Sequence, residues 1–316
     1  MSSPLVTVGI PFYNASRWLF DAVKSVFAQT FTDWELILMD DGSSDGSVET
    51  ARSICDPRVR VYSDGRNLQV AARRNQIVQY ATGAYLAWLD ADDMMLPSRL
   101  EKQSEFLERN PRVDVVGTGM YTLGLQGEIV GRRVPRRGGR PSCRPTHSPL
   151  FQPTVMGRIE WFRQNLSDPS LERAADMEMF LRTAGHSRFA NLDELLTFYR
   201  EYGSFSLAKY RLASRCIRRV IRRHGPRVVG RLRTEIEVAA SFLKPAVYAV
   251  AYYSGLHRLL LRRRSLPISP EERELVEAVL ERIWHQELPL SQTSSAATSF
   301  AEESVEPPGG QNVVKS

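Results

Sequence analysis

Short apolar runs alternate with amphipathic stretches over the first third of the chain. The apolar runs have the length of buried strands and span residues 5–10, 35–39, 59–62, 85–89 and 113–116. The stretches between them place apolar side chains at helical spacing, at residues 16–29, 45–54, 68–81 and 97–109. Strands that alternate with helices of this length are typical of βαβ units. We therefore predict an α/β fold with a mostly parallel sheet flanked by helices.

The pattern changes beyond residue 117. A hairpin, two helices and two strands are predicted at 120–123 with 129–134, at 158–165 and 174–184, and at 187–191 and 195–202. Ten basic residues and no acidic residue lie between Lys209 and Arg233, and an apolar helical stretch and one more helix follow. The last residues are rich in Ser, Glu, Pro and Gly, a composition that does not bury a core. We predict a catalytic α/β domain over 1–205, a basic, amphipathic helical extension over 206–288 and a disordered tail over 289–316.

Composition narrows the class of partner. The 316 residues carry a formal net charge of +6, which favours ligands with phosphates, including nucleotides, nucleic acids and anionic membranes. The three cysteines are far apart and form no C-x-x-C pair, so neither a zinc site nor a disulfide framework is indicated. The N-terminus has no basic segment followed by an apolar one, so no signal peptide is predicted. The expected compartment is the reducing cytosol.

Two acidic clusters follow apolar strands, about fifty positions apart. Asp40 and Asp41 come directly after the second strand, and Asp90, Asp92 and Asp93 come after the fourth. In open α/β sheets, ligands bind in the crevice outside the carboxyl ends of the strands. Asp90 and Asp92 have the D-x-D spacing that lets two carboxylates address one Mg²⁺ or Mn²⁺ ion, if the segment is extended. The alternative is that Asp92 or Asp93 caps a short turn.

Other candidate residues have a structural alternative beside the functional one. Tyr13 follows the first strand and offers a ring that stacks on a base. Asp41 is interpreted as a ligand group, whereas Asp45 is interpreted as a helix cap. In the 72–75 segment (ARRN), an Arg reaches a phosphate or lies on a solvated helix face. Asp176 and Glu178 open a helix, where they either complement the helix dipole or one of them acts as a general base.

Five segments together resemble family 2 inverting glycosyltransferases of the GT-A fold, a Rossmann-like α/β fold. They are VTVGIPFYN (6–14), WELILMDDGSSDGS (34–47), ARRN (72–75), GAYLAWLDADD (83–93) and LPSRLEKQSEFLERNP (96–111). The resemblance covers roughly residues 4–200. It implies a nucleotide-sugar donor, usually a UDP-sugar, a divalent cation and transfer to a hydroxyl of a glycan or lipid-linked acceptor, as in cell-surface polysaccharide synthesis.

The resemblance also assigns roles to single residues. Pro11 and Tyr13 match positions that flank the base, and Asp41 matches the acid that contacts base or ribose. Arg74 matches the arginine near the nucleotide, with neighbouring Arg73 as the other possible register.

On the metal and acceptor side, Asp92 matches the direct metal ligand of the family, and Asp90 matches a residue that contacts ribose or a metal-bound water. Asp176, upstream of Arg182, matches the acceptor-side base. Gln152 stands where the family usually has a histidine.

Two other classes of function stay open at this point. A nucleotidyltransferase also combines an α/β sheet with acids and a metal, although its Gly-rich loop is missing after the first strand. A nucleic-acid-binding protein would use the basic helices, but these lack interleaved aromatic residues, so no nucleic acid is expected. The basic segment from Lys209 to Arg233 has two interpretations. It contacts the anionic cytoplasmic face of a membrane peripherally, or it packs on the catalytic domain and exposes its arginine face to solvent.

Overall fold

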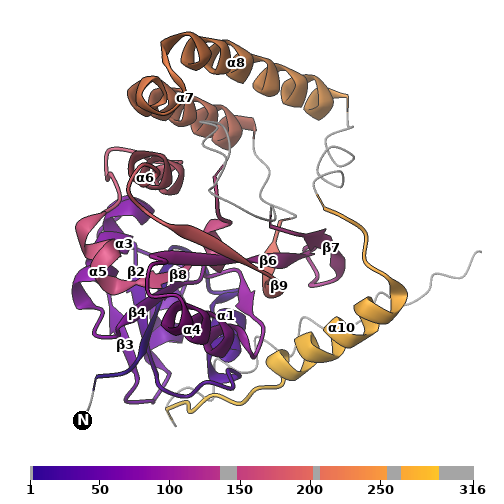
Figure 1. Cartoon of the computed structure of the whole chain (residues 1–316). Coiled ribbons are helices and arrows are strands. Elements are labelled where there is room, and N and C mark those ends of the chain that lie inside the picture. Colours follow the sequence, from indigo (N-terminus) through magenta and orange to yellow (C-terminus); the bar gives the residue numbers. More distant parts are fainter. Residues whose placement is uncertain (1–2, 136–147, 202–206, 255–264, 292–316) are drawn as a thin grey trace, which may run out of the picture.

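The computed structural model describes residues 3–135, 148–201, 207–254 and 265–291. A single sheet with strand order β3-β2-β1-β4-β8-β6-β9-β5 forms its centre, and β7 is added on β6 (Figure 1). The first half of the sheet is parallel and consists of β1 (Val6–Phe12), β2 (Trp34–Asp40), β3 (Val59–Tyr62) and β4 (Tyr85–Trp88). The predicted α/β fold is confirmed.

The second half of the sheet is mixed. It contains β5 (Met94–Met95), β6 (Val115–Leu123), β7 (Ile129–Arg133), β8 (Met156–Arg158) and β9 (Phe189–Arg200). In this half β6 and β9 run parallel, whereas β8 is antiparallel to both of its neighbours. Two short strands were expected where the structure has the single strand β6, and two more where it has the single strand β9. The register shifts at Gly117 and Gly119 of β6, and these glycines had interrupted the apolar pattern.

Of the parallel strands, β1, β2 and β4 are buried on both faces, so their apolar runs are continuous rather than alternating, whereas β3 at the edge is half-buried. One face packs against α1 (Leu19–Phe27), α2 (Ser47–Arg52) and α4 (Arg99–Arg109). The other face packs against α3 (Gln69–Tyr80), α5 (Ile159–Gln164) and α6 (Ala175–Thr183). Successive residues of β2 show the division, because Leu36 and Leu38 join the first core and Ile37 and Met39 the second.

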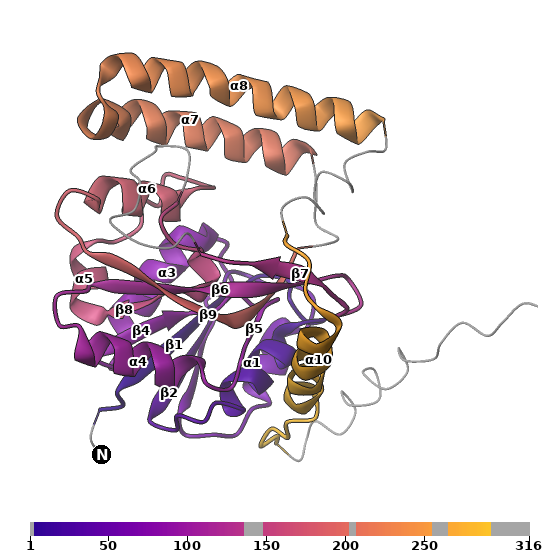
Figure 2. The same cartoon turned by 45° about the vertical axis from the view of Figure 1, so that its right-hand side comes forward.

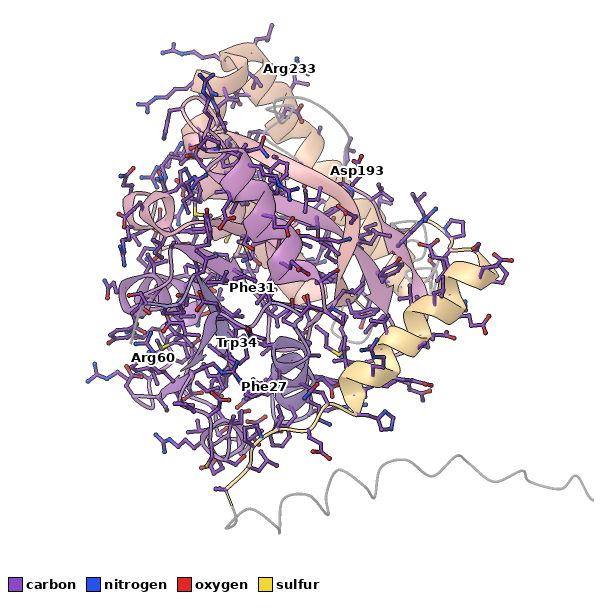
Figure 3. All side chains as sticks on the ribbon, turned by 60° about the horizontal axis from the view of Figure 1, so that its bottom comes forward. Phe27, Phe31, Trp34, Arg60, Asp193 and Arg233 are labelled. Carbon is purple, nitrogen blue, oxygen red and sulfur yellow. The ribbon has the colours of Figure 1, made fainter. Side chains whose placement is uncertain are left out.

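The basic segment forms a helical hairpin of α7 (Leu207–Val229) and α8 (Arg231–Tyr253). In two views α7 lies between α6 and α8, and α8 is outermost (Figures 1 and 2). Val220 and Ile221 of α7 pack with Met177 and Leu181 of α6 in a separate apolar cluster. Arg233, near the start of α8, lies at one end of the molecule, and Phe27 and Trp34 lie toward the other (Figure 3).

The last described helix, α10 (Pro270–Trp284), lies against α1 rather than on the α7–α8 hairpin (Figure 2). Ser269 caps it by accepting a hydrogen bond from the Glu272 amide at 3.1 Å. Leu290 then pairs with Ile54. The rest of the predicted disordered tail, from 292, lies outside the described residues. None of the helices in the described ranges has the length and hydropathy needed to cross a bilayer.

Candidate functional site

The ends of β1, β2 and β4 are joined by main-chain hydrogen bonds at one edge of the sheet. The Asp41 amide donates to the Phe12 carbonyl at 2.8 Å, and the Leu89 amide donates to the Gly9 carbonyl at 3.1 Å. Because these strands are parallel, the residues that follow them emerge on the same side. The two acidic clusters therefore lie at one edge, as the sequence predicts.

Asp41 is anchored by the neighbouring loop and by Arg73. Its Oδ1 accepts from the Leu68 amide at 2.7 Å and from Arg73 Nε at 3.0 Å. Gly42 makes this approach possible, because its φ is +79° and a Cβ there would lie 2.8 Å from the Arg66 carbonyl carbon. Arg73 is fully buried and also pairs with Asp64 at 2.6 Å. It is therefore part of the folded framework.

Arg74, the next residue, faces the site. Its Nη2 lies 2.9 Å from Asp90 Oδ1, and its guanidinium lies 5.7 Å from the centre of the Trp88 ring. Gly9 of β1 lets α3 come this close to the sheet, since a Cβ there would lie 2.7 Å from Ile77 Cγ2. The geometry thus favours Arg74 over Arg73 as the arginine that reaches a ligand.

Asp90 and Asp92 occupy a tight turn rather than the extended segment that the D-x-D argument assumed. The turn is closed by the Asp93 amide, which donates to the Asp90 carbonyl at 3.1 Å. Burial, and then the charge of Asp90, raise the pKa of Asp92 to about 6. Asp90 is therefore near enough for its charge to act on Asp92, and a turn rather than an extended segment brings the two residues together.

Asp93 is fully buried beneath this turn. Its Oδ1 accepts from the Arg200 amide at 2.9 Å, so it does not cap the turn. Burial, and then the charges of Asp92 and Asp90, raise the pKa of Asp93 well above its usual range. Arg99 of α4 is also fully buried, and burial lowers its pKa to about 9. The sequence analysis gave no role to Arg99, because a charged residue on an amphipathic helix is usually solvated.

The carboxylates at the turn fit a divalent cation held partly by a ligand. Mg²⁺ is commonly bound by one or two carboxylates together with substrate phosphates and water. Asp92 and Asp90 supply that number, and burial, followed by the nearby charge of Asp90, raises the pKa of Asp92, so a cation at this place would favour its charged form. Within the described ranges, no group of three or more His, Cys, Asp or Glu side chains forms a complete protein cage for a metal.

Asp176 lies in a pocket on the other side of Arg74. The pocket is lined by side chains of α3, β4, α5 and α6 and of the loops between them, among them Arg74, Asn75, Trp88, Gln152, Ser167 and Asp176. Asn75 fixes one wall, because its side-chain amide exchanges two hydrogen bonds of 2.9 Å with the main chain of Ser167. Arg74 therefore joins the D-x-D turn to the pocket that contains Asp176.

The remaining candidates lie at the same edge or support it. Pro11 is buried within β1, whereas Tyr13 is 53% exposed just beyond it. Asp45 is not the N-cap residue of α2, which is Gly46. Its carboxylate nevertheless accepts from the Ser47 amide, the first of α2, at 3.1 Å, so it satisfies a free amide at the helix start, and it accepts from the Ser16 amide at 3.0 Å, which joins the loops that follow β1 and β2.

Glu178, two residues beyond Asp176, has a structural role. It is 1% exposed and accepts from Arg182 Nε at 3.0 Å. His224 of α7 lies 2.9 Å from the same carboxylate, so this contact docks the basic hairpin on α6. The sequence offered no signal for it, because His224 is isolated among arginines.

A parallel-sheet edge that carries acidic side chains, next to a pocket with one acid, is an arrangement compatible with a nucleotide-sugar transferase of the GT-A class. Comparison with known proteins agrees with this class. Residues 7–166 match the family described as "Glycosyl transferase family 2". The chain belongs to this family and is a glycosyltransferase. The nucleotidyltransferase alternative is thereby set aside.

Individual relatives are similar to part of the chain. EpsE of Bacillus subtilis (strain 168) is 34% identical over 207 residues, which are 63% of this chain and 74% of EpsE. The UDP-Glc:alpha-D-GlcNAc-diphosphoundecaprenol beta-1,3-glucosyltransferase WfgD of Escherichia coli is 31% identical over 134 residues, 42% of this chain and 52% of WfgD.

Among solved structures, the mannosyltransferase PcManGT from Pyrobaculum calidifontis, in complex with GDP-Man and Mn²⁺, superposes with a TM-score of 0.57 at 15% identity. It covers 90% of this chain and 87% of its own. At this level of identity, the similarity shows a shared fold and nothing more.

Proposed function

We propose that the protein moves a sugar from a nucleotide-diphosphate donor, a UDP-sugar, to a hydroxyl of a glycan or lipid-linked acceptor, with inversion at the anomeric carbon. The observation that carries the proposal is the position of Arg74. It contacts Asp90 of the D-x-D turn at 2.9 Å and also lines the pocket that contains Asp176. Donor diphosphate and acceptor would therefore meet beside one arginine.

The nucleoside would lie at the ends of β1 and β2. Tyr13 offers an exposed ring for stacking on the base, next to Pro11. Asp41 uses its Oδ1 to hold Leu68 and Arg73, and we assign its second oxygen to the base or ribose. The name of WfgD, which begins with UDP-Glc, supports the choice of uridine.

The diphosphate would lie between the D-x-D turn and Arg74. Asp92 would hold Mn²⁺ or Mg²⁺ directly, and Asp90 would contact it, or its water, as well as Arg74. When bound, the cation supplies positive charge for the departing diphosphate. PcManGT, of the same fold, is described with Mn²⁺, which supports a metal at this place.

In the transfer step, Asp176 takes the proton of the acceptor hydroxyl as general base. The hydroxyl oxygen then bonds to the anomeric carbon from the face opposite the diphosphate. The bond from that carbon to the diphosphate oxygen breaks, and its electron pair leaves with the diphosphate, whose charge Arg74 stabilises. A single displacement of this kind inverts the configuration.

We further propose peripheral contact with the cytoplasmic face of an anionic membrane through the outer side of α8. Leu232, Ile236, Leu243, Val247 and Val250 recur at helical spacing and are all exposed, from 55% to 80%. Arg231 and Arg233 lie at the start of the same helix. An apolar stripe beside basic residues is suited to the interface of an anionic bilayer. We also propose that the catalytic domain ends at residue 205 and that the helical extension ends at residue 288.

The general base is tested by Asp176→Asn, with Glu172→Gln, an exposed acid before the same helix, as the matched control. The assay measures release of UDP from a panel of UDP-sugars when membrane lipid extract supplies the acceptor. We expect Asp176→Asn to lose about 10²–10⁴-fold in rate and to keep Mn²⁺-dependent UDP binding. If Asp176→Asn transferred sugar at the wild-type rate, Asp176 would not be the general base.

A further inference from the structure

Five arginines line an open groove on the α7–α8 hairpin. The groove walls are Arg215, Arg218, Arg219, Arg222 and Arg223 of α7 and Phe242 of α8. Their spacing on α7 puts successive guanidinium groups on one face of the helix, one turn apart. Like charges at this spacing repel one another, so the groove is costly unless an anion neutralises it.

Little of this charge is neutralised within the protein. Arg223 pairs with Asp168 at 2.9 Å. Across the described ranges, no acidic side chain lies within salt-bridge distance of the other four arginines. Arg218 points most directly to an anionic ligand, because its Nη1 is buried and has no hydrogen-bond partner. Its guanidinium is held 4.2 Å from the centre of the Phe242 ring, which fixes its position in the groove.

The groove lies between the acceptor pocket and the apolar stripe of α8. Asp168, the partner of Arg223, directly follows Ser167, which lines the pocket of Asp176. On its other side, α7 packs against α8, the outermost helix (Figures 1 and 2). The apolar stripe of α8 is exposed. The order from the pocket outward is therefore polar pocket, cationic groove, apolar surface.

This order matches one kind of molecule. We propose that the groove binds the diphosphate of a lipid-linked acceptor, whose sugar reaches Asp176 at the rim of the pocket and whose hydrocarbon chain lies along the membrane beside α8. Arginine forks bind phosphate oxygens in pairs, and a diphosphate offers several such oxygens to neighbouring arginines. The proposal rests on the proposed function, to which it adds the chemical class of the acceptor.

The test measures binding to three kinds of vesicle at physiological salt, using the full chain. One kind carries farnesyl diphosphate in phosphatidylcholine, the second carries phosphatidylglycerol at equal surface charge, and the third is phosphatidylcholine alone. The groove variant is Arg219→Ser with Arg222→Ser, and the matched control is Arg227→Ser with Arg211→Ser, two exposed arginines of α7 outside the groove. Thermal melting confirms that each variant is folded.

We expect the wild type to prefer farnesyl diphosphate vesicles to phosphatidylglycerol vesicles. The groove variant should lose about tenfold or more of its affinity for them, while the control retains it. Equal binding to the two anionic vesicles, or an unchanged groove variant, would overturn the proposal. Mn²⁺-dependent UDP binding by the same variants reports separately on the donor site, so failure of the groove is distinguishable from failure of the proposed function.

Discussion

Arg73 Nε donates to Asp41 Oδ1 at 3.0 Å, and both side chains are buried. The adjacent Arg74 instead turns toward Asp90. Two consecutive arginines of α3 thus have different tasks. The first holds the loop after β2 in place, and the second lies where a diphosphate is proposed to bind.

Replacing Arg73 should therefore affect stability first. Arg73→Leu leaves the buried Asp41 carboxylate without its partner, and breaking a buried pair in this way costs about 3–5 kcal/mol. Urea unfolding followed by circular dichroism measures the free energy of unfolding. An Arg73→Leu protein as stable as the wild type would show that the pair is dispensable.

Replacing Arg74 should affect transfer instead. Arg74→Ala removes a donor that stabilises the departing diphosphate, which we expect to lower kcat by about 10²–10³-fold. Its free energy of unfolding should stay near that of the wild type, because the group is at the edge of a pocket. The steady-state rate of UDP release tests this, and an unchanged kcat would contradict the role given to Arg74.

Replacing Asn75 should affect acceptor binding and leave donor binding unchanged. Asn75→Ala breaks both hydrogen bonds to Ser167 and releases one wall of the pocket. We expect the KM for the acceptor to rise and the affinity for UDP to stay the same. Gln79→Ala, an exposed change on the same helix, is the matched control, and a variant with weakened UDP binding would show that the wall serves the donor.

The contact between His224 and Glu178 predicts a pH dependence. Burial lowers the pKa of His224 from its ordinary value of 6.5, because the buried ring resists protonation. The stability that it contributes is full above about pH 6.5 and is lost as the pH falls below that value, where the unfolded chain takes up a proton and the folded protein does not. Melting temperature measured across this range should fall for the wild type and fall less for His224→Gln. Parallel curves would contradict the assignment.

The apolar stripe of α8 predicts membrane binding that depends on single residues. Leu243→Asp and Val247→Asp place charges on the stripe and should abolish co-sedimentation with phosphatidylglycerol vesicles. Leu275→Asp, at an exposed apolar position of α10, should have no effect. If the stripe variants instead changed the self-association of the protein measured by analytical ultracentrifugation, the stripe would bind a second copy of the chain rather than a membrane.

The sequence predicted the parallel strands, the helices between them and the acidic edge of the sheet because these follow from local pattern, whereas the short strands β5 and β8 were not predicted. Apolar runs followed by acids locate Asp41 and Asp90 at strand ends without knowledge of the packing. The division of labour between Arg73 and Arg74 was not predictable, since both occupy one helix and differ by a rotation of about 100°. Arg99 was missed, and Glu178 was predicted as a helix-opening acid but not as a buried one, because burial of a charged group depends on partners distant in the chain.

The most direct test of the donor site is a thermal-shift measurement of the full chain with UDP-, GDP- and dTDP-sugars, with and without Mn²⁺, for the wild type and Asp92→Asn. The account predicts that UDP-sugars stabilise the wild type most, that this requires Mn²⁺, and that Asp92→Asn loses the Mn²⁺-dependent part. Stabilisation by a UDP-sugar that is independent of both Mn²⁺ and Asp92, or none by any nucleotide-sugar, would contradict it.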